Sequence, residues 1–212
     1  MNQGTFITPE RLRMFFHPRS IALVGATDRS RWSIYTHQNL KVFGFPGPIY
    51  CVNPNYETVH GEPAVKRLSD IREAVDLAFI MVPTQRVYSI LEEAAAVGIS
   101  NVVILTSGFS EMGTKGQELE QRILDFAQEH NMTMLGPNGN GFVNVASQIL
   151  PYGLPVQPPL VKGPVGVVLQ SGALPLQRRR LLLRGRKSTL CRADVMPRLE
   201  AEQADDSGRC DE

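Results

Sequence analysis

Short runs of apolar, often β-branched residues alternate with longer amphipathic segments through the first two thirds of the chain. The runs have the composition of strands that are buried on both faces of a sheet. They cover residues 20–25, 48–53, 77–82, 102–106 and 133–135. The segments between them with helical spacing cover residues 34–43, 87–97 and 115–130. This alternation predicts βαβ units and an α/β fold with a doubly wound parallel sheet.

Two of the helical segments have a clear apolar face. The expected buried positions are Leu91, Ala94, Ala95 and Gly98 in one, and Leu119, Ile123, Leu124 and Ala127 in the other. Right-handed crossovers between parallel strands place all the strand-to-helix loops at one edge of the sheet, where ligands bind in such folds.

The pattern changes in the last third of the chain. Residues 1–147 form the expected first domain, and residues 148–164 contain five prolines, which predicts a linker. Residues 165–174 are typical of the first strand and turn of a second, flavodoxin-like α/β domain that is incomplete here. Residues 175–212 are Arg-rich and then acidic, without apolar periodicity, which predicts a poorly ordered tail.

Composition and charge argue against several classes of protein and partner. The chain has 212 residues, 42% hydrophobic and 20% charged, with a net charge of +1, so it is typical of a globular protein without a nucleic-acid or membrane partner. Residues 1–16 have no signal-peptide core, and no apolar run is long enough to cross a bilayer, which predicts a cytoplasmic protein. Cys51, Cys191 and Cys210 are too far apart for a metal motif.

The first loop, residues 25–30, follows the first strand and precedes a helix. Backbone N–H groups at such a turn, in front of a helix N-terminus, favour a phosphate. Gly25 permits a tight turn, while Thr27 and Ser30 add hydroxyl groups. A plain strand–helix turn capped by a hydroxyl would have the same residues, so the loop alone is weak evidence.

Two features argue against a dinucleotide cofactor. The first loop lacks the G-x-G-x-x-G pattern. The second strand ends in Val52-Asn53-Pro54, without the acidic residue that meets the ribose of NAD.

Three further loops carry small polar residues to the same edge. They contain Val82-Pro83, Thr106-Ser107-Gly108 and Gly136-Pro137-Asn138. Together with the first two loops they predict a cleft for a phosphorylated ligand.

The amino-acid sequences of these segments, and their order along the chain, resemble those of a known family. They are SIALVGAT from residue 20, GFPGPIYCVNP from 44, DLAFIMVP from 76, VVILTSGFSEMG from 102, MLGPNGNG from 134 and GPVGVVLQSGA from 163. The chain resembles the Rossmann-like CoA-binding domain of NDP-forming acyl-CoA synthetases, especially ADP-forming ones, which are relatives of the succinyl-CoA synthetase α subunit. The resemblance covers roughly the first four-fifths of the chain.

The resemblance implies a role for each loop. Gly25, Ala26, Thr27 and Ser30 would hold the CoA phosphates, and Val52, Asn53 and Pro54 would line the adenine and ribose side. Val82 and Pro83 would pack along the nucleotide or the pantetheine arm, and Thr106, Ser107 and Gly108 would lie near the thiol. Gly136, Pro137 and Asn138 would face the reaction centre, and Ser171 with Gly172 would begin a helix that holds the phosphate of a phosphohistidine. Ser171 as a simple helix cap explains the same two residues equally well.

The chain also departs from the family. Gly139 stands where a cysteine is common. The histidines, His17, His37, His60 and His130, all precede the family's catalytic position, so no catalytic residue and no metal site is predicted. His60 is expected in a surface loop, whereas His37 lies close to the first loop. We expect ATP and Mg²⁺ to act only through a missing ATP-grasp domain or partner subunit.

The leading hypothesis is therefore that this chain supplies the CoA site of an acid–thiol ligase. A non-catalytic CoA-binding regulatory module is the main alternative, and an NAD(P)-linked oxidoreductase is a third. The abrupt change of composition after Leu174 suggests a truncated or frame-shifted reading frame.

Overall fold

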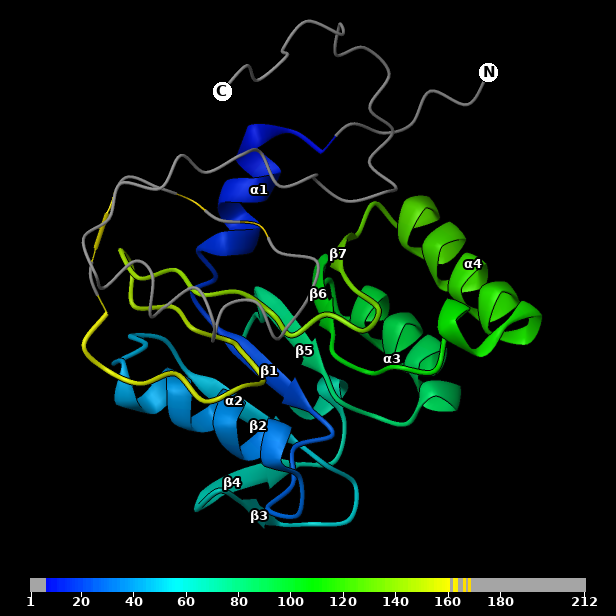
Figure 1. The fold of residues 1–212 in the computed structure, drawn as a ribbon. Coiled ribbons are helices and arrows are strands. Elements are labelled where there is room, and N and C mark those ends of the chain that lie inside the picture. Colours follow the sequence, from blue (N-terminus) through cyan, green and yellow to red (C-terminus); the bar gives the residue numbers. More distant parts are fainter. Residues whose placement is uncertain (1–6, 161, 164–165, 167, 169–212) are drawn as a thin grey trace, which may run out of the picture. The chain divides into compact units, whose positions relative to one another are not determined.

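The structure is a computed structural model that describes residues 7–160, 162–163, 166 and 168. Figure 1 shows the arrangement of its elements. They are α1 (Pro9–Phe16), β1 (Ile21–Val24), α2 (Arg31–Val42), β2 (Ile49–Val52), β3 (Thr58–Val59), β4 (Glu62–Val65), β5 (Leu77–Ile80), α3 (Thr84–Ala96), β6 (Asn101–Ile104), α4 (Thr114–Glu129) and β7 (Thr133–Leu135), with short 3₁₀ turns η1 (Leu68–Asp70) and η2 (Ser110–Met112).

The strands form one sheet in the order β3-β4-β2-β1-β5-β6-β7. All neighbouring strands are parallel except β3 and β4. The chain winds outward from β1 in one direction and from β5 in the other, so the doubly wound α/β fold is confirmed. The antiparallel β3–β4 hairpin at one edge was not predicted, because its strands are short, lack a continuous apolar run and contain Pro63.

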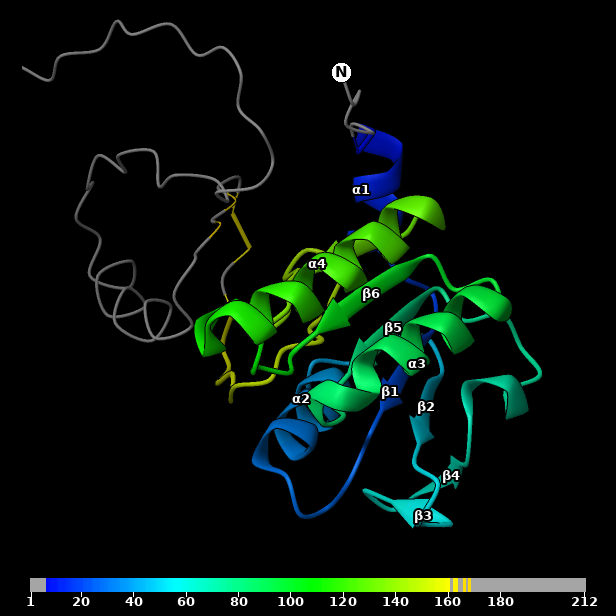
Figure 2. The same ribbon diagram turned by 90° about the vertical axis from the view of Figure 1, so that its right-hand side faces the viewer.

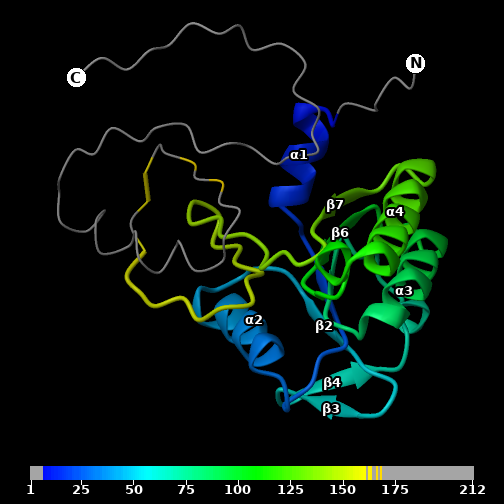
Figure 3. The ribbon, with the colours of Figure 1, turned by 45° about the vertical axis from the view of Figure 1, so that its right-hand side comes forward.

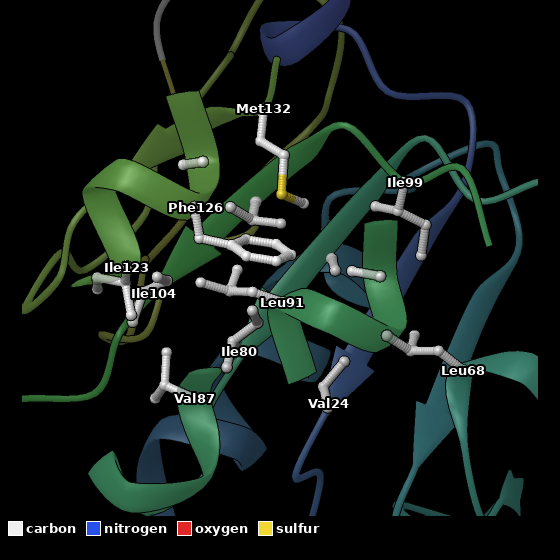
Figure 4. Close-up of a cluster of buried hydrophobic side chains, with 14 of the residues drawn as sticks. Val24, Leu68, Ile80, Val87, Leu91, Ile99, Ile104, Ile123, Phe126 and Met132 are labelled. Atoms are coloured by element: carbon white, nitrogen blue, oxygen red, sulfur yellow. The ribbon is translucent and has the colours of Figure 1, made fainter. Parts of the chain in front are cut away.

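Alternate residues of the central strands pack on opposite faces of the sheet. In β1, Ala22 and Val24 join a core cluster with residues of α3 and α4, which is shown in Figure 4. Ile21 and Leu23 join a second cluster that includes Leu40 of α2. Figure 2 shows the consequence: α3 and α4 cover one face, and α2 lies behind the other.

The helices agree with the predicted segments, except that α2 and α3 each begin three residues earlier than predicted. α2 begins at Arg31 because Ser30 caps it, accepting a hydrogen bond from the Ser33 N–H at 3.5 Å. Two of the expected buried positions are exposed, namely Gly98 after α3 and Leu119 of α4, whose exposed fraction is 37%. The buried stripe of α4 runs instead through Gly116, Ile123, Phe126 and Ala127.

Helix α1 was not predicted. Thr8 caps it by accepting the Arg11 N–H, and Pro9 occupies its first turn. The Arg11 guanidinium donates to the side chain and carbonyl of Asn131, at 2.6 Å each, and to the Thr133 hydroxyl at 3.0 Å. These contacts join α1 to the start of β7.

The chain after β7 returns to the face that α2 covers. The buried Asn39 side chain donates to the carbonyls of Tyr152 and Leu154, at 2.7 and 2.8 Å, and accepts the Val156 N–H at 3.2 Å. Leu150 is fully buried. The first part of the Pro-rich segment therefore packs on the domain, and the described residues 7–160 belong to one compact unit.

The predicted second domain (165–174) and tail (175–212) lie outside the described residues, apart from residues 166 and 168. Within the described residues, no helix combines the length and apolar character needed to cross a membrane.

Candidate functional site

The carboxyl ends of the parallel strands meet at one edge of the sheet, and the loops that follow them contain the predicted site residues. The chain leaves β1 for α2 on one face and leaves β5 for α3 on the other, so the boundary between β1 and β5 is the topological switch point (Figure 3). In open α/β sheets this boundary is the usual position of a bound ligand.

The first loop begins with Gly25, whose backbone conformation and close neighbours leave room only for glycine. Gly25 has φ +83°, and its N–H donates to the Val52 carbonyl at 2.9 Å. A Cβ at this position would lie 2.8 Å from the Met81 carbonyl oxygen. The loop therefore passes directly over the ends of the neighbouring strands.

Most polar groups of the first loop bond to one another. The Thr27 N–H donates to Ser33 Oγ at 2.9 Å, and the Arg29 N–H donates to Thr27 Oγ1 at 3.3 Å. Ser30 Oγ is the helix cap. These bonds fix the shape of the loop, and the role of Gly25, Ala26, Thr27 and Ser30 in holding phosphates stays a prediction.

Asn53 ties the second loop to the first. Its side-chain amide donates to the Ala26 carbonyl at 2.8 Å, and its Oδ1 accepts the Asn55 N–H at 2.9 Å. Val52 and Asn53 are both buried, whereas Pro54 is exposed. The first two thus shape the predicted adenine side of the site from beneath, and Pro54 lies on its surface.

The loops after β5 and β6 are tied together by two threonines. Thr106 Oγ1 donates to the Val82 carbonyl, and Thr84 Oγ1 donates to the Ser107 carbonyl, both at 2.7 Å. Gly108 has φ +99° and donates its N–H to Glu111 Oε1 at 2.6 Å. This bond, with those from other backbone N–H groups, lowers the pKa of the Glu111 carboxyl.

The loop after β7 is tied to β6 and the loop that follows it. Asn138 donates its N–H to the Thr106 carbonyl at 3.0 Å, and Gly139 donates to the Ile104 carbonyl at 3.1 Å. Gly136 and Asn138 have positive φ, +104° and +57°. The structure therefore brings Thr106, Gly136, Pro137 and Asn138 together, while Ser171 and Gly172 lie outside the described residues.

His60 lies in the turn between β3 and β4, a loop as expected, but its side chain points into the protein and is only 5% exposed. The ring stacks on His37 of α2 with the centroids 4.9 Å apart. Burial, followed by the charge of His60, lowers the pKa of His37. Sequence spacing could not show this pair, because the two histidines come from different elements.

A Rossmann-like α/β sheet with glycine-bearing loops gathered at its switch point defines the class of this protein. Residues 19–144 match the family described as "CoA binding domain", which is more than half of the chain. The chain belongs to this family.

The relatives include ADP-forming acetate–CoA ligases. The chain is 38% identical over 162 residues to acetate–CoA ligase [ADP-forming] II of Archaeoglobus fulgidus, covering 76% of this chain and 24% of the relative. It is 37% identical to the acetate–CoA ligase [ADP-forming] II α subunit of Pyrococcus furiosus, covering 77% and 35%. The chain thus spans between a fifth and two fifths of the relatives it matches.

Solved structures agree with the fold. A protein of Pyrococcus horikoshii OT3 superposes with a TM-score of 0.74 at 33% identity, covering 82% of this chain and 39% of that one. The acetyl-coenzyme A synthetase 1 of Ca. Korarchaeum cryptofilum, solved with phosphate and ADP, has a TM-score of 0.63 at 30% identity, covering 71% and 32%.

Proposed function

We propose that this chain binds coenzyme A at the carboxyl edge of its sheet and supplies the CoA site of an ADP-forming acid–thiol ligase. The observation that carries the proposal is the first loop, which stands at the switch point of a domain whose family is described as CoA-binding. A phosphate at this position would meet a helix N-terminus, where N–H groups and the helix dipole favour an anion.

The tied loops support a division of labour along the ligand. In this proposal Gly25, Ala26, Thr27 and Ser30 contact the phosphates, and Pro54 lies beside the adenine. Val82 and Pro83 flank the pantetheine arm. Thr106, Ser107 and Gly108, joined by hydrogen bonds to the loops on both sides, lie nearest the thiol. Gly136, Pro137 and Asn138 then close the site toward the acid.

The whole reaction in this proposal converts an acid, ATP and CoA into acyl-CoA, ADP and phosphate. This chain holds CoA and orients its thiol, which reduces the entropy lost in the bond-forming step. Two of the similar proteins are named as α subunits, which supports a separate partner that handles ATP and Mg²⁺. A cytoplasmic location is part of the same proposal.

Calorimetric titration of the full chain with CoA tests the binding step, with NADH and ATP as controls. The sharpest variant is Thr27→Glu, since a carboxylate in the first loop would repel the phosphates. Thr27→Gln is the matched neutral control. We expect saturable CoA binding that Thr27→Glu weakens by about tenfold or more, equivalent to roughly 1.4 kcal/mol, and that Thr27→Gln weakens much less. A folded protein that does not bind CoA would contradict the proposal.

The regulatory alternative needs a different measurement. Purification of the chain with its associated proteins from native cells, followed by an assay for acid- and CoA-dependent ADP formation, separates the two. A complex that forms ADP and acyl-CoA supports the ligase. A CoA-binding chain whose complexes never do so supports a regulatory module. NADH binding in place of CoA would favour the oxidoreductase, against which the buried, fully engaged Asn53 argues.

A further inference from the structure

A chain of hydrogen bonds runs from the β3–β4 turn into the first loop. His60 Nδ1 lies 2.8 Å from Asp28 Oδ1, and His60 Nε2 lies 2.8 Å from Ser33 Oγ. The His60 N–H also donates to Asp28 Oδ1 at 3.0 Å. Ser33 Oγ in turn accepts the Thr27 N–H at 2.9 Å. One imidazole thus connects the two sides of the loop.

Burial makes this connection stronger than a surface contact. Ser33 is fully buried and the His60 side chain is 5% exposed, whereas the Asp28 side chain is 65% exposed. Hydrogen bonds strengthen in such a low-dielectric environment, and a lost partner leaves a polar group unsatisfied. The imidazole therefore reaches outward from the interior to hold the carboxylate at the surface of the loop.

The order Asp–His–Ser is also that of a hydrolase triad, but the geometry excludes that role. A nucleophilic serine needs access to a carbonyl carbon. Ser33 has no exposed surface, and its Oγ already accepts the Thr27 amide. The three groups act on the loop itself.

We propose that His60 is a positioning residue for the first loop. It holds the Asp28 carboxylate, which would repel an anionic ligand, and it fixes Ser33 and with it the Thr27 amide. This inference rests on the proposed function, because it assumes that the ligand at the loop is a phosphate group of CoA. Its consequence is that an edge hairpin far along the chain controls the shape of the central site.

The two ring nitrogens of His60 have different roles in these bonds. In the neutral ring Nδ1–H donates to Asp28, and Nε2 accepts the Ser33 hydroxyl hydrogen. Each ring nitrogen thus holds one end of the chain of hydrogen bonds, the Asp28 carboxylate on one side and the Ser33 hydroxyl on the other.

The other ionisable groups around this ring are accounted for. His37 stacks on it from α2, and Lys41 of α2, Glu62 of β4 and Asp28 also act on that histidine. Burial lowers the pKa of His37, and among the described residues its Nε2 is buried without a hydrogen-bond partner, so this atom adds no hydrogen bond to the chain that His60 makes.

His60→Asn tests the proposal in the full chain. His60 has φ +55°, a conformation that asparagine tolerates well, but the shorter side chain cannot span Asp28 and Ser33. We expect faster hydrogen exchange of the Thr27 amide, measured by NMR without ligand, and about tenfold weaker CoA binding. His37→Phe is the control, since it keeps the stacked ring and removes none of these hydrogen bonds; it should leave both readouts unchanged.

Asp28→Asn gives the second readout. It keeps an acceptor for His60 Nδ1 but removes the charge, so the exchange of the Thr27 amide should remain as slow as in wild type. Faster exchange in Asp28→Asn, as in His60→Asn, would show that the charge of Asp28 rather than the position of the ring orders the loop.

Unchanged Thr27 exchange and unchanged CoA affinity in a folded His60→Asn protein would overturn the positioning role. An equal loss in His37→Phe would also overturn it, because the effect would then come from general packing. If wild type does not bind CoA, the proposed function fails, while the exchange of the Thr27 amide without ligand still decides whether His60 positions the loop.

Discussion

At the scale of single residues, backbone geometry dominates the site. Gly25 turns the chain where β1 ends, and Gly61 turns it between β3 and β4, both with positive φ. They differ in their surroundings: a side chain at Gly25 would meet the Met81 carbonyl, whereas nothing lies within 4 Å of the corresponding position at Gly61. A comparison of Gly25 with Gly61 therefore separates the cost of a strained backbone conformation from the cost of a steric clash.

Alanine at these two positions should therefore have unequal effects. Gly61→Ala adds only the strain of a left-handed alanine, about 1 kcal/mol, while Gly25→Ala adds the clash as well and should lower the free energy of unfolding by about 3 kcal/mol. Urea unfolding followed by circular dichroism measures both. Equal losses in the two variants would show that the backbone at Met81, directly after β5, moves away from the new side chain without lowering the free energy of unfolding further.

Asp76 carries a second prediction at this scale. It accepts hydrogen bonds from the backbone and side chain of Arg19, at 2.8 Å for the N–H and for Nε. The Arg19 side chain lowers the pKa of the Asp76 carboxyl. A carboxyl with a lowered folded-state pKa stabilises the fold above its unfolded pKa, and this stabilisation is lost as the pH falls through the folded value.

We expect Asp76→Asn to flatten the acid side of the stability profile. Urea midpoints of wild type should fall between about pH 5 and about pH 2, and the variant should fall less over the same range. Asp125→Asn, in an exposed i,i+4 contact with Gln121, is the control and should follow wild type. Parallel profiles for wild type and Asp76→Asn would contradict the assignment.

At this scale the sequence located the loops that follow the strands, because a strand end followed by glycine and hydroxyl residues is a local signal, while the ligand contacts of these residues stay predictions. Sequence patterns did not predict which groups those residues bond. Ser33 and Asp28 meet His60 across 27 and 32 residues of chain, and no spacing rule connects them. The histidine also occupies a two-residue hairpin turn that asparagine fills more often, so the turn itself gave a weak signal.

At the scale of elements, each helix is held by its apolar stripe. Leu91 of α3 is fully buried in the cluster shown in Figure 4, whereas Leu119 of α4 is 37% exposed. The five main strands were predictable from their continuous apolar, often β-branched runs, and the three helices from an apolar periodicity that extends over 12 to 16 residues. Helix α1 and the β3–β4 hairpin were not, because short elements are stabilised by contacts such as those of Arg11 with Asn131.

Leu91→Ala and Leu119→Ala compare the two positions with the same change of side chain. We expect Leu91→Ala to lower the free energy of unfolding by about 3 kcal/mol, from lost burial and the cavity left behind. Leu119→Ala should cost less than about 1 kcal/mol. Chemical denaturation gives both values, and a Leu119→Ala loss as large as that of Leu91→Ala would mean that α4 packs differently.

At the scale of the whole described domain, distant segments are joined by a few buried polar side chains. Asn39 is 4% exposed and makes three hydrogen bonds to residues more than a hundred positions away. The segment it holds has little regular structure and many prolines, which is why its composition predicts a linker. Such a segment keeps its place through side chains of the domain rather than through its own pairing.

Asn39→Ala should release that segment. The substitution leaves two carbonyls and one N–H without partners, and we expect a loss of about 2 kcal/mol in the free energy of unfolding. Exchange of backbone amides in residues 150–156 should rise before global unfolding. The exposed neighbour Gln38→Ala is the control. Unchanged protection of this segment would show that its apolar contacts alone suffice.

The buried ring of His60 also has a consequence for how this domain tolerates change. A two-residue turn in a short hairpin at the edge of a sheet is a place where insertions, loop exchanges and affinity tags are usually tolerated. Here the same turn sends a side chain into the interior, beneath the start of α2. Among relatives that share this fold, we expect the length of the β3–β4 turn to vary only together with the residues at positions 28 and 33.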